Sequence, residues 1–120
     1  MAVKKVSQRE IVEVPFIMPE GGTKPHPALV LSTSELFDME DGMFYAALIS
    51  TENFHSEYTI QIQDRWLNKP MNQSSYIVTH IITFFNVNEV TQSNGRFMLE
   101  EYFDPVLYKV IENVFGLEIE

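Results

Sequence analysis

Cysteine is absent from this sequence of 120 residues. Its absence excludes disulfide bonds, thiolate nucleophiles and zinc sites built on cysteine, although it leaves the cellular compartment undecided. Long hydrophobic runs are also absent, and no stretch approaches the length that crosses a bilayer. The first ten residues carry Lys4 and Lys5 without an apolar run after them, which is not the pattern of a secretory signal. We therefore expect a cytoplasmic protein.

Basic residues are scarce, since eight Lys and Arg stand against seventeen Asp and Glu and give a net charge of −9. That charge repels phosphate backbones and excludes the broad basic surface of a non-specific nucleic-acid binder. Any contact with RNA or DNA must therefore be confined to a local pocket. One stretch without Lys or Arg contains Glu35, Asp38, Glu40, Asp41, Glu52 and Glu57. We interpret it as a solvated face rather than an acidic ligand-binding face.

Apolar residues make up 45% of the chain and aromatic residues 12%, enough to bury one core without help from metals or disulfides. There is no internal repeat, no low-complexity segment and no linker that would divide the chain. We expect a single domain over residues 1–120.

Most of the predicted elements are short strands. Alternating or β-branched apolar residues indicate strands at 10–16, 28–31, 44–50, 57–62, 75–80 and 82–87. The Asn94-Gly95 turn signal precedes a further short strand at 96–99. Prolines and glycines crowd residues 18–26 and predict a loop, and residues 32–42 read as a long connection. Residues 64–73 break the strand pattern.

A terminal helix is expected over about 104–115. Asp104 is suited to capping it and Pro105 to its first position. One apolar stripe follows the helix to Gly116: Val106, Leu107, Val110, Ile111, Val114 and Phe115. Five to seven short strands that close on themselves, with one packed helix, favour a mainly β fold of the small-barrel type.

Three stretches in this order and spacing resemble the PemK/MazF-like (Kid-like) toxins of type II toxin-antitoxin systems. They are Glu10-Ile11-Val12-Glu13-Val14-Pro15-Phe16, Lys24-Pro25-His26-Pro27-Ala28-Leu29-Val30-Leu31-Ser32 and Ala46-Ala47-Leu48-Ile49-Ser50-Thr51. A fourth stretch, Ser75-Tyr76-Ile77-Val78-Thr79-His80 with Thr83-Phe84 behind it, is similar to the next core strand of that family. The resemblance covers about the first two-thirds of the chain.

This resemblance implies an SH3-like β-barrel with a C-terminal α-helix that forms a homodimer. It also implies an endoribonuclease that cuts single-stranded RNA without a metal or other cofactor, by attack of the 2′-hydroxyl. An antitoxin protein would restrain it by filling the RNA groove.

The family usually has an arginine just before the Pro-Ala-Leu-Val run, where this chain has His26. Some members use an arginine and an aspartate two residues apart on the fourth stretch, where this chain has Val78 and His80. Metal-free RNA cleavage needs a base, an acid and donors that stabilise charge on the phosphate. Two imidazoles with a pKa near 6.5 are suited to the proton transfers.

The candidate site therefore contains His26 and His80 as the catalytic proton-transfer pair. Ser50 is the catalytic hydroxyl, Thr51 a second phosphate donor, and Lys24 the remaining local positive charge. The competing interpretation is that both histidines are ordinary surface or satisfied polar residues.

Other residues carry weaker hypotheses. His55 can reach the same groove, although a surface role fits it better. Trp66 is suited either to stacking on a base or antitoxin side chain or to covering the core. Glu100, Glu101 and Asp104 are explained by the capping and dipole of the terminal helix rather than by a metal site.

Two functions remain open from the sequence. One is the endoribonuclease toxin. The other is a catalytically degenerate member of the family that acts as a protein-interaction or regulatory module, because both family arginines are replaced. A fold-only resemblance with an unrelated function is the third possibility.

Overall fold

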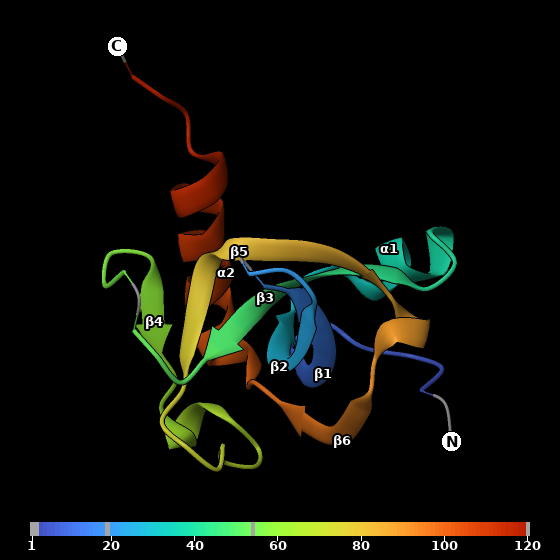
Figure 1. The fold of residues 1–120 in the computed structure, drawn as a ribbon. Coiled ribbons are helices and arrows are strands. Elements are labelled where there is room, and N and C mark those ends of the chain that lie inside the picture. The colour runs from blue at the N-terminus through green and yellow to red at the C-terminus, as the bar shows by residue number, and fades with distance from the viewer. Residues whose placement is uncertain (1–2, 19, 54, 120) are drawn as a thin grey trace.

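A computed structural model describes residues 3–18, 20–53 and 55–119, so Pro19 in the predicted loop lies outside the described residues. Six strands form one antiparallel sheet in the order β4-β5-β3-β2-β1-β6 (Figure 1). They span Glu10–Ile17 (β1), Thr23–Val30 (β2), Met43–Ser50 (β3), Thr59–Gln61 (β4), Tyr76–Asn86 (β5) and Gln92–Phe97 (β6). The helices are α1 (Ser34–Met39) and α2 (Glu100–Phe115), with two 3₁₀ turns at Asp64–Trp66 (η1) and Val87–Glu89 (η2).

The mainly β fold with a C-terminal helix is confirmed, but strand pairing does not close the sheet. Within the described ranges β4 and β6 are the two edges of an open order. An isolated bridge between Leu67 and Met98 links the segment after β4 to the end of β6. No helix in the described part of the chain is long and apolar enough to cross a bilayer.

The two faces of the sheet bury separate apolar clusters because side chains alternate along each strand. One face packs Val14, Phe44 and Phe85 together and is closed at its margin by Phe37 of α1. The opposite face packs Leu29, Ile49, Ile77 and Phe103 beneath α2. Each fully buried side chain of this size contributes about 1.5–3 kcal/mol to folding. The six acids of the stretch 35–57 are all exposed, in agreement with a solvated face.

The hairpin of β1 and β2 is tighter than the sequence predicts. The expected loop over 18–26 is wrong at its end, because β2 begins at Thr23 and places His26 in a strand. Gly21 and Gly22 have φ values of 95° and 71° and make the turn. The first half of β2 pairs with β1 alone, so the missing N–H groups of Pro25 and Pro27 break no ladder on the other side.

The expectation of two strands at 75–80 and 82–87 is also wrong, because β5 is continuous from Tyr76 to Asn86. It contains a large bulge, since Ala47 pairs with Ile82 but Ile49 pairs with Ile77. One residue of β3 therefore faces four residues of β5 at this point. A bulge bends a strand and re-aims its side chains, and here it includes His80.

The region around Asn94 also departs from expectation. Asn94 and Gly95 lie inside β6, where the register with β1 shifts, and not in a turn ahead of a strand at 96–99. Gly95 has a φ of 77°, which suits a bulge as well as a tight turn.

The terminal helix begins four residues earlier than expected. Leu99 is its N-cap, and the N–H groups of Tyr102 and Phe103 both donate to the Leu99 carbonyl. Asp104 therefore lies inside the helix rather than at its cap. Pro105 is tolerated near the start, where it removes a single helical hydrogen bond. The predicted stripe is buried at Val106 and Val110 but exposed from Ile111 onward, because α2 extends past the sheet (Figure 1).

The connection between α1 and β3 depends on glycine at position 42. Gly42 has a φ of 92°, its N–H donates to the Phe37 carbonyl, and its carbonyl accepts from Val87. An added Cβ would lie 3.0 Å from Cγ1 of Val87. This turn therefore holds the end of α1 and the start of β3 close to the end of β5.

We predict that Gly42→Ala destabilises the fold more than Gly21→Ala. Both positions have left-handed backbone, which costs an L-residue about 1–2 kcal/mol. An alanine Cβ at Gly21 meets nothing within 4 Å, whereas at Gly42 it presses on Val87, so we expect about 1 kcal/mol more there. Urea denaturation of the two variants measures the difference. Equal midpoints would show that the contact with Val87 is not limiting.

Candidate functional site

His26 and Lys24 project from the same face of β2, two residues apart. The His26 ring meets the Phe16 ring edge to face, with the ring centroids 6.2 Å apart. Nε2 of His26 is buried and has no hydrogen-bond partner among the described residues. Burial lowers the pKa of His26 from 6.5, Lys24 lowers it further, and a hydrogen bond with the Ile49 backbone acts in the opposite direction. The imidazole is therefore neutral at pH 7.

Ser50 ends β3 beside this histidine. The pairing of β2 with β3 ends at Ala28 and Leu48, and the contact of His26 with the Ile49 backbone brings the histidine next to the end of β3. Ser50 is buried, and its Oγ accepts a hydrogen bond of 3.1 Å from the backbone N–H of Glu52. Thr51 follows and is exposed. The start of β2 and the end of β3 thus bring Lys24, His26, Ser50 and Thr51 to one end of the sheet.

His80 lies on the bulge of β5 and is exposed. Its ring centroid is 4.9 Å from that of Tyr58 and 5.9 Å from that of His55. Tyr58 and His55 are themselves the two ends of a turn, closed by a 2.9 Å hydrogen bond from the Tyr58 N–H to the His55 carbonyl. The weaker candidate His55 therefore joins the site, and Tyr58 is a neighbour that no linear motif indicates.

The buried Thr79 holds this arrangement in place. Its N–H and its Oγ1 both donate to the Tyr58 carbonyl, at 2.9 and 2.6 Å. Its Oγ1 also accepts a 2.8 Å hydrogen bond from Nδ2 of Asn113 on α2. Because Thr79 turns toward α2, His80 is turned outward next to Tyr58.

An apolar pocket of about 300 Å³ lies between Phe16, which packs on His26, and the pair of His55 and His80. Its lining includes Phe16, Leu48, His55 and His80. His26 contacts the pocket through Phe16, and Ser50 is two residues beyond Leu48 on β3. Of the five predicted site residues only His80 lines this pocket, so the structure places His26 and His80 in separate clusters.

The position that holds an arginine in some PemK/MazF-like toxins is part of the core here. Val78 is fully buried in the cluster with Phe44 and Phe85, so a long cation has no room at this place. Lys24 is the positive charge that acts on His26. Imidazoles and hydroxyls therefore outnumber fixed positive charges among the five candidate residues.

Trp66 covers the core beneath α2 and lies in the opposite cluster from His26. Its ring stacks on Tyr102 with centroids 5.8 Å apart and an interplanar angle of 13°. Its Nε1 is buried without a hydrogen-bond partner in the described part of the chain. Of the two roles considered for Trp66, covering the core is the one that agrees with these contacts.

No protein-family model matches this sequence, and no curated protein matches it either. Solved structures do match. MazF (Form-I) from Deinococcus radiodurans superposes with a TM-score of 0.69 at 14% identity, over 93% of this chain and 97% of that one. The Mycobacterium tuberculosis toxin MazF-mt6 superposes with a TM-score of 0.67 at 21% identity, over 92% of this chain and 100% of the other.

A third match is an endoribonuclease in complex with its cognate antitoxin from a mycobacterial species. The TM-score is 0.68 at 11% identity, over 97% of this chain and 100% of that chain. The alignments span nearly the whole of each molecule, so the likeness includes the open sheet and the terminal helix together. The chain therefore has the fold of these MazF-type toxin structures, as its resemblance to the PemK/MazF-like family predicted.

Proposed function

We propose that this protein is a metal-independent endoribonuclease of the PemK/MazF type that cleaves single-stranded RNA and is inhibited by an antitoxin. The observation that carries the proposal is the fold shared with endoribonuclease toxins, in which one pocket is lined by His80 and by Phe16, the residue whose ring packs against His26. The SH3-like barrel expected for that family is part of the proposal, with the open six-stranded sheet and its terminal helix as support.

Each candidate residue has a distinct role in this proposal. His26 is neutral because burial lowers its pKa, so it acts as the base that takes the 2′-hydroxyl proton. His80 is exposed to solvent and acts as the acid that protonates the leaving 5′-oxygen. The hydroxyls of Ser50 and Thr51 donate to the phosphate oxygens, and Lys24 supplies local positive charge. Proton transfer by two imidazoles requires no metal ion or cofactor.

We predict that wild-type protein cleaves a mixed-sequence single-stranded RNA in the presence of EDTA. His26→Ala and His80→Ala should each lower the rate by about 10²–10⁴-fold, the usual contribution of a positioned acid or base. Met39→Ala is the control, because it truncates an exposed side chain of α1 outside this pocket, and it should retain activity within about tenfold. Cleavage that is indifferent to both changes, or no cleavage at all, contradicts the proposal.

The pH profile provides a second test. A base with a lowered pKa stays unprotonated until the pH falls below 6.5, so the acidic limb of kcat/KM should have its midpoint below 6.5. Lys24→Ala removes a charge that lowers this pKa and should move the midpoint upward. An acidic midpoint above 6.5 in the wild type, or one unmoved in Lys24→Ala, would assign the base to another group.

The partners follow from the same proposal. The matched mycobacterial endoribonuclease is in complex with its cognate antitoxin, and we propose that an antitoxin binds and inhibits this chain as well. A homodimer in the cytoplasm is the proposed working form. Support for a covered surface comes from Tyr45 and Phe84, whose rings lie tilted against each other with centroids 4.5 Å apart although both are exposed. Ile111 and Phe115 of α2 are exposed as well.

We predict that sedimentation equilibrium gives a mass of twice 13.9 kDa. Ile111→Glu should shift the population toward the monomer, because it places a charge in an apolar interface. Glu112→Gln, at the next and exposed position of α2, is the control and should leave the mass unchanged. A monomeric wild type would remove the dimer from the proposal without affecting the cleavage test.

The second candidate function is a non-catalytic relative that acts as a protein-interaction or regulatory module. Two observations favour it: Val78 occupies the core at an arginine position, and Nε2 of His26 is covered by protein. Growth arrest on expression separates the two functions, since the module would leave growth unaffected and the nuclease would not.

A further inference from the structure

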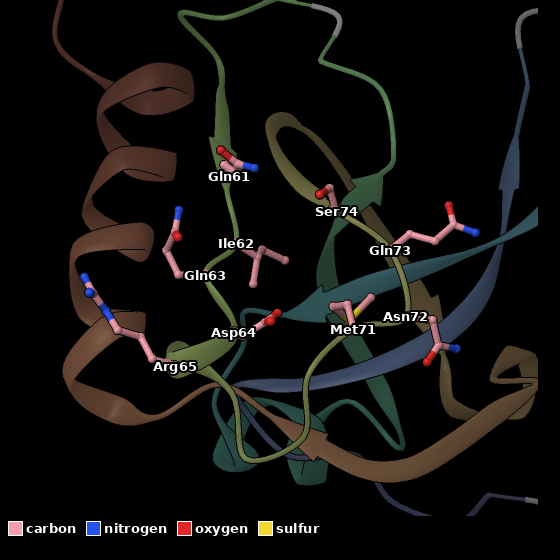
Figure 2. Close-up of a pocket in the computed structure, with 9 residues that line it drawn as sticks. All are labelled: Gln61, Ile62, Gln63, Asp64, Arg65, Met71, Asn72, Gln73 and Ser74. Carbon is pink, nitrogen blue, oxygen red and sulfur yellow. The ribbon is translucent and has the colours of Figure 1, made fainter.

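A polar pocket of about 520 Å³ lies at the end of β4, apart from the histidines. Two chain segments form its walls, residues 61–65 on one side and 71–74 on the other (Figure 2). Figure 2 shows Ile62, Asp64 and Met71 between the two segments. Pockets of this size hold small organic groups and leave room for several polar contacts.

The lining combines an apolar floor with polar groups. Ile62 is buried and Met71 half-buried, and both pack on the cluster beneath α2. Gln61, Gln73 and Asn72 add amides, each of which both donates and accepts. The carboxylate of Asp64 accepts only. A flat ring with polar edges matches this composition, because its face packs on the floor while its edge meets the amides and the carboxylate.

Hydrogen bonds hold the walls, and among the described residues they do not involve the side chains of Gln61, Asp64 or Asn72. The N–H of Ile62 donates to the Ser75 carbonyl at 2.9 Å, and the Ser75 hydroxyl donates to the Gln73 carbonyl at 2.9 Å. The preceding loop is tied to β6, since Arg96 donates to the carbonyls of Lys69 and Pro70, both at 3.1 Å. The pocket is therefore already formed before any ligand arrives, which lowers the ordering cost of binding.

The pocket lies two strands along the sheet from Ser50, at the edge strand β4. Ser50 pairs with Tyr76, and Tyr76 pairs with Gln61, so Gln61 shares a face with Ser50, whereas the floor of Ile62 and Met71 belongs to the cluster beneath α2. Two strand spacings of about 4.8 Å place the Ser50 and Gln61 backbones about 10 Å apart. A nucleotide next to a phosphate held at Ser50 thus has its base within reach of this pocket.

Charge decides which part of a nucleotide the pocket accepts. The guanidinium of Arg65 lies over the Tyr102 ring, 6.0 Å from its centroid, and so is engaged by α2. Asp64 repels phosphate but accepts hydrogen bonds from exocyclic amino groups, as carboxylates do from the cytosine amino group. The ligand is accordingly a base edge that carries an amino group and not a phosphate.

We propose that this pocket binds an unstacked, amino-bearing nucleobase of single-stranded RNA, with Asp64 as the residue that selects for the amino group. The inference rests on the proposed function, because it names the substrate contact that gives that cleavage its sequence preference. Protein recognition of single-stranded RNA commonly takes this form, with splayed bases read at their edges.

The test measures binding to 2′-O-methyl pentanucleotides of cytosine, adenine and uracil, which lack the attacking hydroxyl and stay intact. Full-length wild-type protein should bind the cytosine and adenine oligomers about tenfold more tightly than the uracil oligomer. Asp64→Ala should bring this ratio close to one. Asp38→Ala removes the same charge from an exposed position on α1 and should keep the ratio.

Equal affinity of the wild type for the three oligomers, or a ratio that survives in Asp64→Ala, overturns the pocket proposal. Cleavage of unmodified RNA is scored separately. Amino-base preference without cleavage leaves the pocket standing and removes the nuclease, whereas cleavage with no dependence on Asp64 removes the pocket alone.

Discussion

The architecture of the candidate site depends on the hydrogen bonds of one buried threonine. Thr79 donates twice to the Tyr58 carbonyl and accepts from Asn113 on α2, so a single residue ties the turn before β4, the bulge of β5 and the terminal helix together. The bulge inserts extra residues into β5, and without internal partners it would leave polar backbone groups unpaired next to the core. Those bonds fix the direction in which His80 leaves the strand.

This arrangement accounts for a site with little fixed charge in a protein of net charge −9. Val78 packs in the core, so β5 does not present a cation toward the phosphate, and His80 projects from the bulge two residues later. On the other side of Phe16, burial keeps His26 neutral. The proposed RNA binding would rely on hydrogen bonds and on contacts with bases more than on long-range attraction, which the net charge opposes.

The composition of the polar pocket near Gln61 agrees with this effect of the negative net charge. A negatively charged protein gains little from phosphate contacts, so affinity for a nucleic acid must come from base edges and apolar packing. The floor of Ile62 and Met71 provides the packing, and the amides and Asp64 provide the hydrogen bonds. Because Ser50 and Gln61 lie on the two strands that flank β5, recognition and chemistry would be about 10 Å apart.

Local patterns in the sequence determined the element types. A strand buries alternate side chains and a helix buries one stripe, and both spacings can be recognised in the order of the apolar residues. β1, β3 and α2 were predictable for this reason, and the resemblance of residues 10–51 to PemK/MazF-like toxins indicated the overall fold. Tertiary structure alone decided the strand register, the bulge around His80, the earlier start of α2 and the inclusion of His26 in a strand. Those features arise from hydrogen bonds between residues far apart in the chain, such as Thr79 with Asn113 and Ile62 with Ser75, which no local pattern encodes. The meeting of His80 with His55 and Tyr58 depends on the same long-range bonds.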